Sequence, residues 1–375
     1  MALIKIREVE DKDLIQLAEF LPKGFPYTTK EFWLPLFEMW WTLNPSYTDQ
    51  FPRGWVIEKN RLIVGFIGNI PVKYLVGGLV RIAAASNSWY VDPSVRGIFS
   101  FILFNEFLKQ NLASLFLFKG EDNKHIMNIL SKYKFEEHIL PKSQKQYVYI
   151  IDKKKVRTIL KTFLVNNRMP KLSQLLEYSE RVGFLLFAYL YQKPVIGGSV
   201  PQEEIYISSL CTSCDDSFSK LWEPYLNTCD ATLSRDPKTL NWLYFSSARL
   251  YKRVVIQCHR SRDNKLAGYM VFDLIRTKTC DVGSMQLMDI YIENNDHRVL
   301  ASLTSFAIEL GKQNNGALLI VWSNSPETET YFRSTFTLRR TVQHYRYVRF
   351  SKTPEMKSDR NNYDNVCLSM IYPAQ

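Results

Sequence analysis

The sequence predicts a protein of the α/β (α+β) class with two domains, each built on a mixed β-sheet flanked by helices and joined to the other by a helical linker. Three observations support this fold class. The chain has 375 residues, which is the size of two ordinary domains. One pattern of strands and helices occurs twice, with Gly65 and Gly268 at equivalent places 203 residues apart. Between the two copies, residues 153–194 have a helical period that is interrupted at Pro170.

The first copy begins with a strand and helices, and then has two strands joined by a tight polar turn at Asn60. A fourth strand ends at the sequence DPSVRG, which leads into a helix with apolar residues at helical spacing. A fifth strand, a second helix and a closing strand follow. The expected ranges are 55–72 for the hairpin, 86–91 for the fourth strand, 98–110 for the helix, 113–120 for the fifth strand, 123–132 for the next helix and 146–152 for the closing strand.

The second copy repeats this order. Its hairpin turns at Asn264, and its fourth strand ends at the polar sequence ENNDHR. The expected ranges are 254–275 for the hairpin, 285–292 for the fourth strand, 299–313 for the helix, 316–323 for the fifth strand, 327–334 for the next helix and 342–350 for the closing strand.

These elements set the expected domain boundaries. The N-terminal domain is expected over 1–152 and the C-terminal domain over 201–352. Residues 153–200 form the expected helical linker. Residues 353–375 form a polar tail that we expect to be loosely held.

The composition indicates an ordinary folded protein with a basic surface. Hydrophobic residues make up 46% of the chain, which is enough for a sizeable apolar interior. Lys and Arg number 48 against 37 Asp and Glu, so the net charge of +11 should attract polyanions. The basic residues are not interleaved with aromatic residues in a known stacking motif, so a nucleic-acid partner is not expected.

The sequence predicts neither export nor a membrane span. The apolar run at 182–191 has about half of the roughly 18 residues that a span requires. The N-terminus, MALIKIREVEDKD, is charged almost at once and lacks the features of a secretory signal. We therefore expect a cytoplasmic protein with reduced cysteines. Cys211 and Cys214 have CxxC spacing, but no second CxxC or HxxxH pair follows. Cys229 and His259 would be an improvised second half of a zinc site, so no bound metal is expected.

A candidate anion-binding turn connects the fourth strand of the first half to the next helix, with the sequence VDPSVRGIFS over 91–100. The first amides of a helix have no partner within the helix, and the helix dipole adds positive charge there. A pyrophosphate fits such a helix start. Gly97 would let the backbone approach the anion closely, and Arg96 would add a charged donor. The structural alternative is a turn that merely connects strand and helix.

This segment and the duplicated order of elements resemble the GNAT (GCN5-related N-acetyltransferase) superfamily, in particular its tandem two-domain members. The resemblance covers most of residues 1–150 and about 200–350, and RDPKTLNWLYF at 235–245 also resembles a segment of two-domain members. It implies that acyl-CoA binds at the turn as a co-substrate, with no other bound cofactor. The residues implied to bind it are Trp89, Tyr90, Val91, Arg96, Gly97, Ile98, Phe99, Ser100 and Asn123.

The turn departs from the family pattern in both halves. The usual loop has Arg-Gly-x-Gly before the helix, whereas here Arg96 and Gly97 lead directly to Ile98, so the loop is about two residues shorter. In the second half, ENNDHR has no glycine and has two acidic residues, which would repel a diphosphate. The resemblance therefore implies that CoA binds the first half.

A second family signature is divided between the halves. In the family, an Asn after the fifth strand is followed seven residues later by a Tyr that protonates the leaving thiolate. The second half keeps this spacing in Asn324 and Tyr331, whereas the first half has Asn123 but Leu130 in place of the Tyr. Two interpretations stay open. Either the first half is active and uses another acid or releases the thiolate unaided, or the second half is active with an unusual loop; we favour the first.

Candidate catalytic residues follow from the chemistry of amine acylation. The acceptor amine arrives mostly protonated, so the reaction needs a base or a water held by one. The candidate bases are Glu121 and His125 in the first half and Asp289 in the second, and Tyr331 is the candidate acid. The alternatives are surface positions for the first two, a buried hydrogen-bonded acid or a groove-lining contact for Asp289, and a core position for Tyr331. For Asn123, the alternative to a CoA contact is a helix N-cap. A backbone N–H near 89–91 is the expected donor to the oxyanion.

Aromatic residues are concentrated in three segments. They are FWLPLFEMWW at 32–41, the helix that carries Phe99, Phe101, Phe104 and Phe107, and VGFLLFAYLY at 182–191. One interpretation is a thick core between two domains. The other is a channel for a long acyl chain, in which each buried CH₂ contributes about 0.8 kcal/mol.

The sequence leads to an expected function as an acyl-CoA-dependent N-acyltransferase. The expected acyl group is a medium or long fatty chain, and the favoured acceptor is a Lys or ornithine side chain of a peptide. An acidic precursor peptide suits the basic surface, and the chain resembles GNAT-like maturases that attach fatty acyl groups to peptides. Two alternatives stay open: a small-molecule N-acetyltransferase that acts on an amino sugar or antibiotic, and a non-catalytic GNAT-like binding protein.

Overall fold

The computed structural model describes most of the chain outside the segment that follows Val156. The described residues are 4–76, 78–120, 124–139, 144–156, 204–225, 231–246, 252–276, 283–323, 326–336, 338–342 and 345–350. Contacts divide the chain into two units, which are described one at a time. The first comprises 1–140, 222–250 and 344–375, and the second comprises 141–221 and 251–343.

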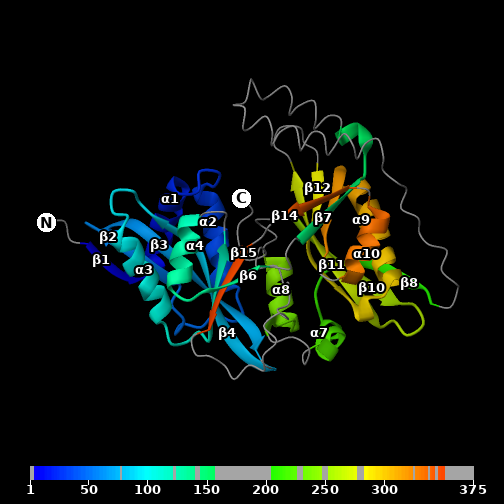
Figure 1. Ribbon diagram of the computed structural model, residues 1–375, viewed down its shortest axis with the longest axis horizontal. Coiled ribbons are helices and arrows are strands. Elements are labelled where there is room, and N and C mark those ends of the chain that lie inside the picture. The colour runs from blue at the N-terminus through cyan, green and yellow to red at the C-terminus, as the bar shows by residue number, and fades with distance from the viewer. Residues whose placement is uncertain are drawn as a thin grey trace. The chain divides into compact units, whose positions relative to one another are not determined.

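The first unit is built on a mixed eight-stranded sheet, in the order β1-β2-β3-β4-β5-β15-β6 with β9 paired to β3 (Figure 1). Neighbouring strands are antiparallel except β4 and β5, which are parallel. The strands are β1 (Ile4–Glu8), β2 (Gly54–Lys59), β3 (Leu62–Val76), β4 (Leu79–Val91), β5 (Leu115–Gly120), β6 (Glu136–Ile139), β9 (Ala231–Leu233) and β15 (Tyr345–Phe350).

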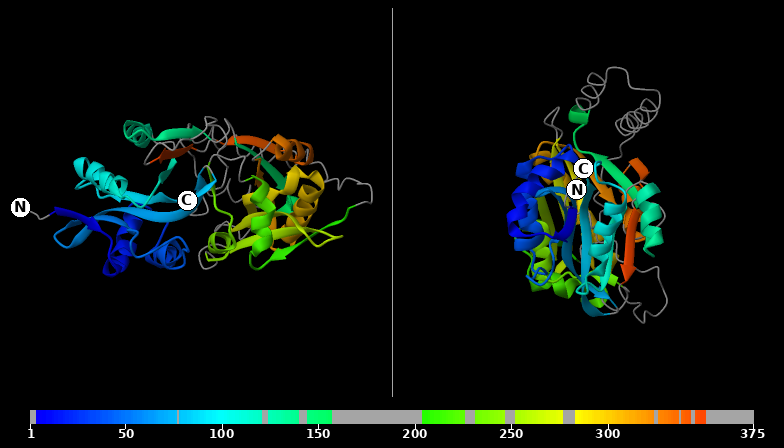
Figure 2. Two further views of the ribbon diagram at one scale, coloured as in Figure 1. Left: turned by 90° about the horizontal axis from the view of Figure 1, so that it is seen from below. Right: turned by 90° about the vertical axis from the view of Figure 1, so that its left-hand side faces the viewer.

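Helices cover both faces of this sheet (Figure 2). Successive side chains of a strand point to opposite faces. Along β4, the ring of Trp89 stacks on Phe104 of one helix layer, and the next ring, Tyr90, contacts Phe20 of the other. The helices are α1 (Leu14–Phe20), α2 (Lys30–Phe37), α3 (Ile98–Lys109), α4 (Lys124–Lys132) and α8 (Pro237–Phe245), with single 3-10 turns at Asp11–Asp13 and Leu21–Lys23 and a π-helical turn at Glu38–Thr42.

The second unit has a seven-stranded mixed sheet in the order β14-β7-β13-β12-β11-β10-β8, in which β12 and β13 are the parallel pair. Its strands are β7 (Gln144–Ile150), β8 (Tyr206–Cys211), β10 (Lys252–Arg260), β11 (Leu266–Arg276), β12 (Gly283–Ile292), β13 (Gly316–Trp322) and β14 (Leu338–Val342). Its helices are α7 (Asp216–Trp222), α9 (His297–Gln313) and α10 (Pro326–Thr335), with a 3-10 turn at Glu293–Asn295. The 3-10 turn that follows α7, at Glu223–Tyr225, belongs to the first unit.

The two sheets confirm the repeat that the sequence predicts. Gly65 of β3 lies opposite Val91 of β4, and Gly268 of β11 lies opposite Ile292 of β12. A side chain at Gly268 would come within 2.8 Å of Val299 on α9, so the helix packs against the bare backbone there. The predicted class, two mixed sheets flanked by helices, is therefore confirmed.

The closing strands are exchanged between the sheets. Sequence order assigns 146–152 to the first half and 342–350 to the second. In the structure, β7 pairs with β13 and β14 of the second sheet, and β15 pairs with β5 and β6 of the first. Alternating side chains identify a strand, but its partner depends on contacts between distant parts of the chain, which the local pattern does not contain.

The expected linker falls outside the described residues beyond Val156, and the expected tail does so entirely. Residues 153–156 are helical. No helix of the described part is both long and apolar enough to cross a membrane.

Candidate functional site

The turn between β4 and α3 is held by hydrogen bonds to one residue. The carbonyl of Asp92 accepts from the amides of Val95 at 3.0 Å and Arg96 at 3.1 Å. Its carboxylate accepts from the amide of Ser94 at 2.9 Å. Asp92 therefore accepts hydrogen bonds from the amides of Ser94, Val95 and Arg96. The next amides in the chain belong to the start of the helix.

The start of α3 is open. Gly97, the residue before the helix, has φ of 89° and ψ of −119°, a conformation suited to glycine, and no side-chain hydrogen bond caps the helix there. A Cβ at Gly97 would meet no atom within 4 Å. Within the described part of the chain, the amides of Gly97, Ile98 and Phe99 have no acceptor, whereas that of Ser100 bonds to the Gly97 carbonyl at 3.1 Å. Three N–H donors thus lie at the positive end of the helix dipole.

Arg96 directly precedes Gly97, and its side chain contacts the end of β4. Its Nε donates to the Val91 carbonyl at 2.7 Å, and the centre of its guanidinium lies 5.6 Å from the ring of Tyr90. Its two Nη groups find no acceptor among the residues that the structure describes, and the side chain is exposed. Hydrogen bonds from Ser94 hold the pKa of Asp92 below its usual value, and the positive charges of Lys23 and Arg96 add to this effect. The positive charges of Lys23 and Arg96 thus offset the negative charge of Asp92, the one acidic residue of the turn.

The sheet of the first unit opens next to this turn. Pairing of β4 with β5 runs from Ala83 to Ala85 only, although both strands continue. Beyond that point β4 carries a bulge, where Ser88 and Trp89 together lie opposite Ile67 of β3 and Ser88 has a positive φ of 54°. The predicted oxyanion donors at 89–91 begin in this bulge, at the edge of the opening.

The equivalent helix start in the second unit is closed by an acidic side chain. Asp296 is the N-cap of α9, and its carboxylate accepts from the amide of Arg298 at 2.8 Å. The same carboxylate forms an ion pair with the Arg298 guanidinium at 2.6 Å and accepts from the Tyr206 hydroxyl at 3.0 Å. A carboxylate of the protein therefore takes the place that an anionic ligand could take in the first unit.

Electrostatics stabilise this closed arrangement. Burial opposes the ionisation of Asp296, but hydrogen bonds from Arg298 and Tyr206 outweigh it and lower the pKa of the carboxyl. Burial and the carboxylates of Glu204 and Asp296 raise the pKa of Tyr206 to about 12. The turn before α9 has no glycine, and Asn294 and Asn295 adopt the positive φ values instead.

The second-unit catalytic candidates lie in different structural layers. Asp289 of β12 is 8% exposed, lies opposite Val271 and accepts from the amide of Ile290 at 2.9 Å. Tyr331 of α10 packs against the core, with its ring 6.0 Å from that of His297 on α9. Burial raises the pKa of Tyr331. These contacts place Asp289 in the sheet and Tyr331 among the helices.

The first-unit catalytic candidates are only partly described. Glu121 and Asn123 lie outside the described residues, as does Asn324 of the second unit. His125 belongs to α4, but its side chain is not among those described. Leu130, which stands at the position of the family tyrosine, is fully buried in the core of the first unit.

The aromatic residues of 32–41 pack on one another inside the first unit. Trp33, Trp40 and Trp41 are at most 2% exposed, and the stacked rings of Phe37 and Trp41 lie 5.2 Å apart. The π-helical turn within this segment was not predicted, and its Met39 carbonyl accepts from the indole of Trp242 on α8 at 2.7 Å. These described rings fit the core interpretation. The other segment considered for an acyl channel, 182–191, lies outside the described residues.

The CxxC pair is buried at the end of β8. A hydrogen bond with Cys214 lowers the pKa of the Cys211 thiol, and the same contact together with burial raises that of Cys214. Cys229 is not among the described residues, and His259 lies on β10. Within the described ranges, no three His, Cys, Asp or Glu side chains are grouped to hold a metal ion.

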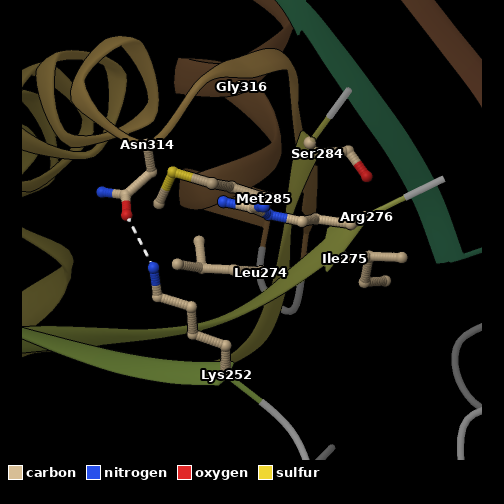
Figure 3. Close-up of a pocket in the computed structure, with 9 residues that line it drawn as sticks. Lys252, Leu274, Ile275, Arg276, Ser284, Met285, Asn314 and Gly316 are labelled. Carbon is tan, nitrogen blue, oxygen red and sulfur yellow. Dashed lines mark hydrogen bonds between the residues drawn. The ribbon is translucent and has the colours of Figure 1, made fainter. Parts of the chain in front are cut away.

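Figure 3 shows a small hollow in the second unit. It involves the first residues of β12, whereas Asp289 lies near the other end of that strand. Lys252 donates to the side chain of Asn314 at 3.1 Å across the hollow. The lining residues are Lys252, Leu274, Ile275, Arg276, Gly283, Ser284, Met285, Asn314 and Gly316. None of the predicted site residues is among them, so this hollow is separate from the candidate site.

Comparison with known proteins finds relatives in structure only. No protein-family model matches the chain. No curated protein matches it in sequence. A probable N-acyltransferase from Enterococcus faecalis aligns with a TM-score of 0.56 and 9% identity, over 94% of this chain and 73% of that one.

Two further structures cover nearly the whole chain. A GCN5-related N-acetyltransferase from Anabaena variabilis aligns with a TM-score of 0.53 and 11% identity, over 93% of this chain and 73% of that one. Saccharomyces cerevisiae N-myristoyltransferase with bound myristoyl-CoA aligns with a TM-score of 0.54 and 12% identity, over 99% of this chain and 89% of its own. At these identities the likeness concerns the fold, and it confirms the predicted tandem GNAT-like fold.

Proposed function

We propose that the chain is an acyl-CoA-dependent N-acyltransferase that binds acyl-CoA in its first unit. The observation that supports this most is the contrast between the two helix starts. At α3, three amides and the Nη groups of Arg96 are available to a phosphate, whereas at α9 the carboxylate of Asp296 occupies the equivalent place. Of these two helix starts, the one at α3 is open to an anion. This fits a tandem protein in which one half binds the acyl donor.

The proposed reaction is direct transfer to an amine. The amine nitrogen attacks the carbonyl carbon of the thioester, a base takes the amine proton, and the C–S bond breaks to release the CoA thiolate. Backbone N–H groups in the bulge at 88–89 or just after it would stabilise the oxyanion. Leu130 cannot protonate the thiolate, but a thiol has a pKa of about 8.5, so its thiolate leaves without strong acid assistance.

The roles of the remaining candidates follow from this assignment. We assign the general base to Glu121 or His125, which follow β5 in the sequence. Asp289 and Tyr331 belong to the unit whose helix start is closed, and we assign them structural roles there. Among proteins of this fold, N-myristoyltransferase holds a fatty acyl-CoA, which favours a medium or long acyl donor for this chain. The favoured acceptor is a Lys or ornithine side chain of a peptide, to which the basic surface is suited.

Calorimetric titration with CoA and with acyl-CoAs of two to sixteen carbons tests the donor site. In Arg96→Ala, we expect the affinity for every CoA ligand to fall tenfold or more, because a charge-assisted bond to phosphate is lost. Arg298→Ala is the matched control, since it removes the arginine near the closed start of α9, and it should bind like the wild type. Equal losses in both variants, or no loss in Arg96→Ala, would contradict the assignment to the first unit.

Mass spectrometry of reaction products then separates the proposed function from its alternatives. Amide formation on Lys-containing or ornithine-containing peptides with fatty acyl-CoA supports the proposal. Acetylation of amino sugars or antibiotics alone would identify a small-molecule N-acetyltransferase. Binding of acyl-CoA without any transfer to peptides or small amines would identify a non-catalytic binding protein.

A further inference from the structure

The segment between α1 and α2 packs directly on the end of β4. A side chain at Gly24 would come within 2.4 Å of the ring of Tyr90, so a glycine is required for this close approach. The φ of Gly24 is −94°, which any residue can adopt, and the glycine therefore serves packing and not backbone conformation. The rings of Phe20 and Phe25 also contact Tyr90, with centroids 5.2 and 6.3 Å from its own. Residues 20–25 thus fit closely against the ring of Tyr90.

The same ring contacts the arginine of the candidate donor turn. The centre of the Arg96 guanidinium lies 5.6 Å from the Tyr90 ring, and its Nε donates to the Val91 carbonyl at 2.7 Å. These two contacts restrict an exposed side chain, which reduces the conformational entropy that Arg96 loses when it binds an anion. Tyr90 therefore links residues 20–25 to the turn at 92–97.

Residues 20–25 carry a second cation, Lys23. This residue is exposed, its ammonium nitrogen lies 5.9 Å from the centre of the Phe20 ring, and no described carboxylate lies within ion-pair distance of it. Hydrogen bonds from Ser94 are the main cause of the lowered pKa of Asp92. Among the positive charges that add to this effect, that of Lys23 contributes at least as much as that of Arg96. The charge of Lys23 therefore acts on the turn at 92–97.

Lys23 decides the net charge at this turn. The charges of Asp92 and Arg96 alone would cancel, whereas Lys23 makes the local charge positive. CoA carries a diphosphate and a further phosphate on its ribose, so its negative charge exceeds what one guanidinium can balance. A second cation close to the turn matches the charge of such a donor.

We propose that Lys23 binds a phosphate of the acyl donor together with Arg96, and that the contact between Gly24 and Tyr90 positions both cations. This inference rests on the proposed function and extends the donor site of that function to the segment between α1 and α2. The backbone next to Lys23 is fixed, because the amides of Gly24 and Phe25 both donate to the Leu21 carbonyl, at 2.9 and 3.0 Å. The lysine side chain ends in a point charge on a flexible stem, which can reach phosphate oxygens without a fixed orientation.

Calorimetric titration of the full chain with CoA tests the role of Lys23. Lys23→Ala should weaken binding about threefold to tenfold, because a partly solvated contact between charges is lost, and the loss should shrink at high salt. Lys23→Arg keeps the charge and should retain the affinity within twofold. Lys220→Ala is the matched control, since it removes an exposed lysine from α7 in the second unit and should bind CoA like the wild type.

Gly24→Ala tests the positioning role, because its methyl group displaces the ring of Tyr90. The affinity for CoA should fall about tenfold as both cations shift. In a Lys23→Ala background the same substitution should have a smaller effect, since the part that acts through Lys23 is already lost. Gly311→Ala is the matched control in the second unit: its Cβ would also come within 2.4 Å of a side chain, that of Ile151, and it should leave the affinity for CoA unchanged.

The outcomes separate the inference from the proposed function. If the wild type does not bind CoA, or if Arg96→Ala binds it unchanged, the proposed function fails together with the inference. If Arg96→Ala weakens binding but Lys23→Ala does not, or if Lys220→Ala causes the same loss as Lys23→Ala, the inference alone is overturned. Equal losses in Gly24→Ala and Gly311→Ala would overturn the positioning role of the Gly24 contact. Thermal unfolding of the lysine variants verifies that these exposed substitutions leave the fold intact.

Discussion

The proposed donor site depends on the backbone of Gly97 more than on its lack of a side chain. A Cβ there meets only open space, but the φ of 89° with ψ of −119° is unfavourable for any other residue. Gly97→Ala should therefore destabilise the protein by about 1–3 kcal/mol or shift the turn to relieve strain. Because a shifted turn misdirects the three amides, affinity for CoA should fall tenfold or more in calorimetric titration.

Gly78 provides the control for this prediction. It also has a positive φ, of 77°, and open space around the position of a Cβ, but it lies in the hairpin between β3 and β4. Gly78→Ala should lower the unfolding midpoint in a similar way and leave the affinity for CoA unchanged. A parallel loss of CoA affinity in both variants would mean that general destabilisation, and not the geometry of the turn, accounts for the effect.

The sequence predicts those site residues whose role depends on their immediate neighbours. Arg96 and Gly97 could be identified because a strand end, a glycine and a helix start follow one another in the chain. Asp296 could also have been recognised as a helix cap, since an Asp directly before an apolar-periodic helix is a typical N-cap. Lys23 could not be predicted, because it is almost seventy residues from Asp92 and only the folded chain brings the two charges together.

At the scale of elements, the closed start of α9 should make the stability of the second unit depend on pH. The folded-state pKa of Asp296 is lowered, so the folded protein binds fewer protons there than the unfolded chain, whose Asp pKa is about 3.9. The stabilisation is present above that unfolded value and is lost as pH falls through the lower folded value.

Asp296→Asn tests this dependence, because Asn keeps the helix cap but removes the charge. Urea unfolding at pH 7 and at pH 3 should show a smaller difference in unfolding free energy for the variant than for the wild type. The same difference in both proteins would mean that the Asp296 carboxylate has an ordinary pKa in the folded state.

The sequence predicts the elements better than their pairing. Periodicity located both hairpins and the helices that follow the fourth strands, since these depend on side chains close in the chain. It did not predict the π-helical turn at Glu38–Thr42, whose Met39 carbonyl receives a bond from Trp242 about 200 residues away. Nor did it predict the bulge at Ser88, whose positive φ lies beyond the point where β4 stops pairing with β5.

At the scale of the whole molecule, the structure combines two copies of one fold that differ at the same place. Both sheets contain a parallel pair that separates partway along, and both have a bulge on the longer strand of that pair. One copy leaves the next helix start open, and the other closes it with Asp296. The sheet with the closed helix start includes β7, a strand from the first half of the sequence. The duplication therefore does not give two independent domains.

Exchange of the closing strands predicts that the donor site in the first unit depends on the far end of the sequence. β15 lies between β5 and β6 in the first sheet, and β5 is the strand from which β4 separates beside the bulge. A chain that ends at Gln343 lacks β15, so β5 becomes an edge strand with unpaired amides. We expect fast hydrogen exchange over Leu115–Gly120 and loss of CoA binding, although every residue of the proposed donor site is still present.

A chain that ends at Phe350 is the control, because it keeps β15, and it should retain slow exchange at β5 and the affinity for CoA. Slow exchange at β5 in both truncated chains would show that the first sheet does not depend on β15 and would contradict the exchange of strands.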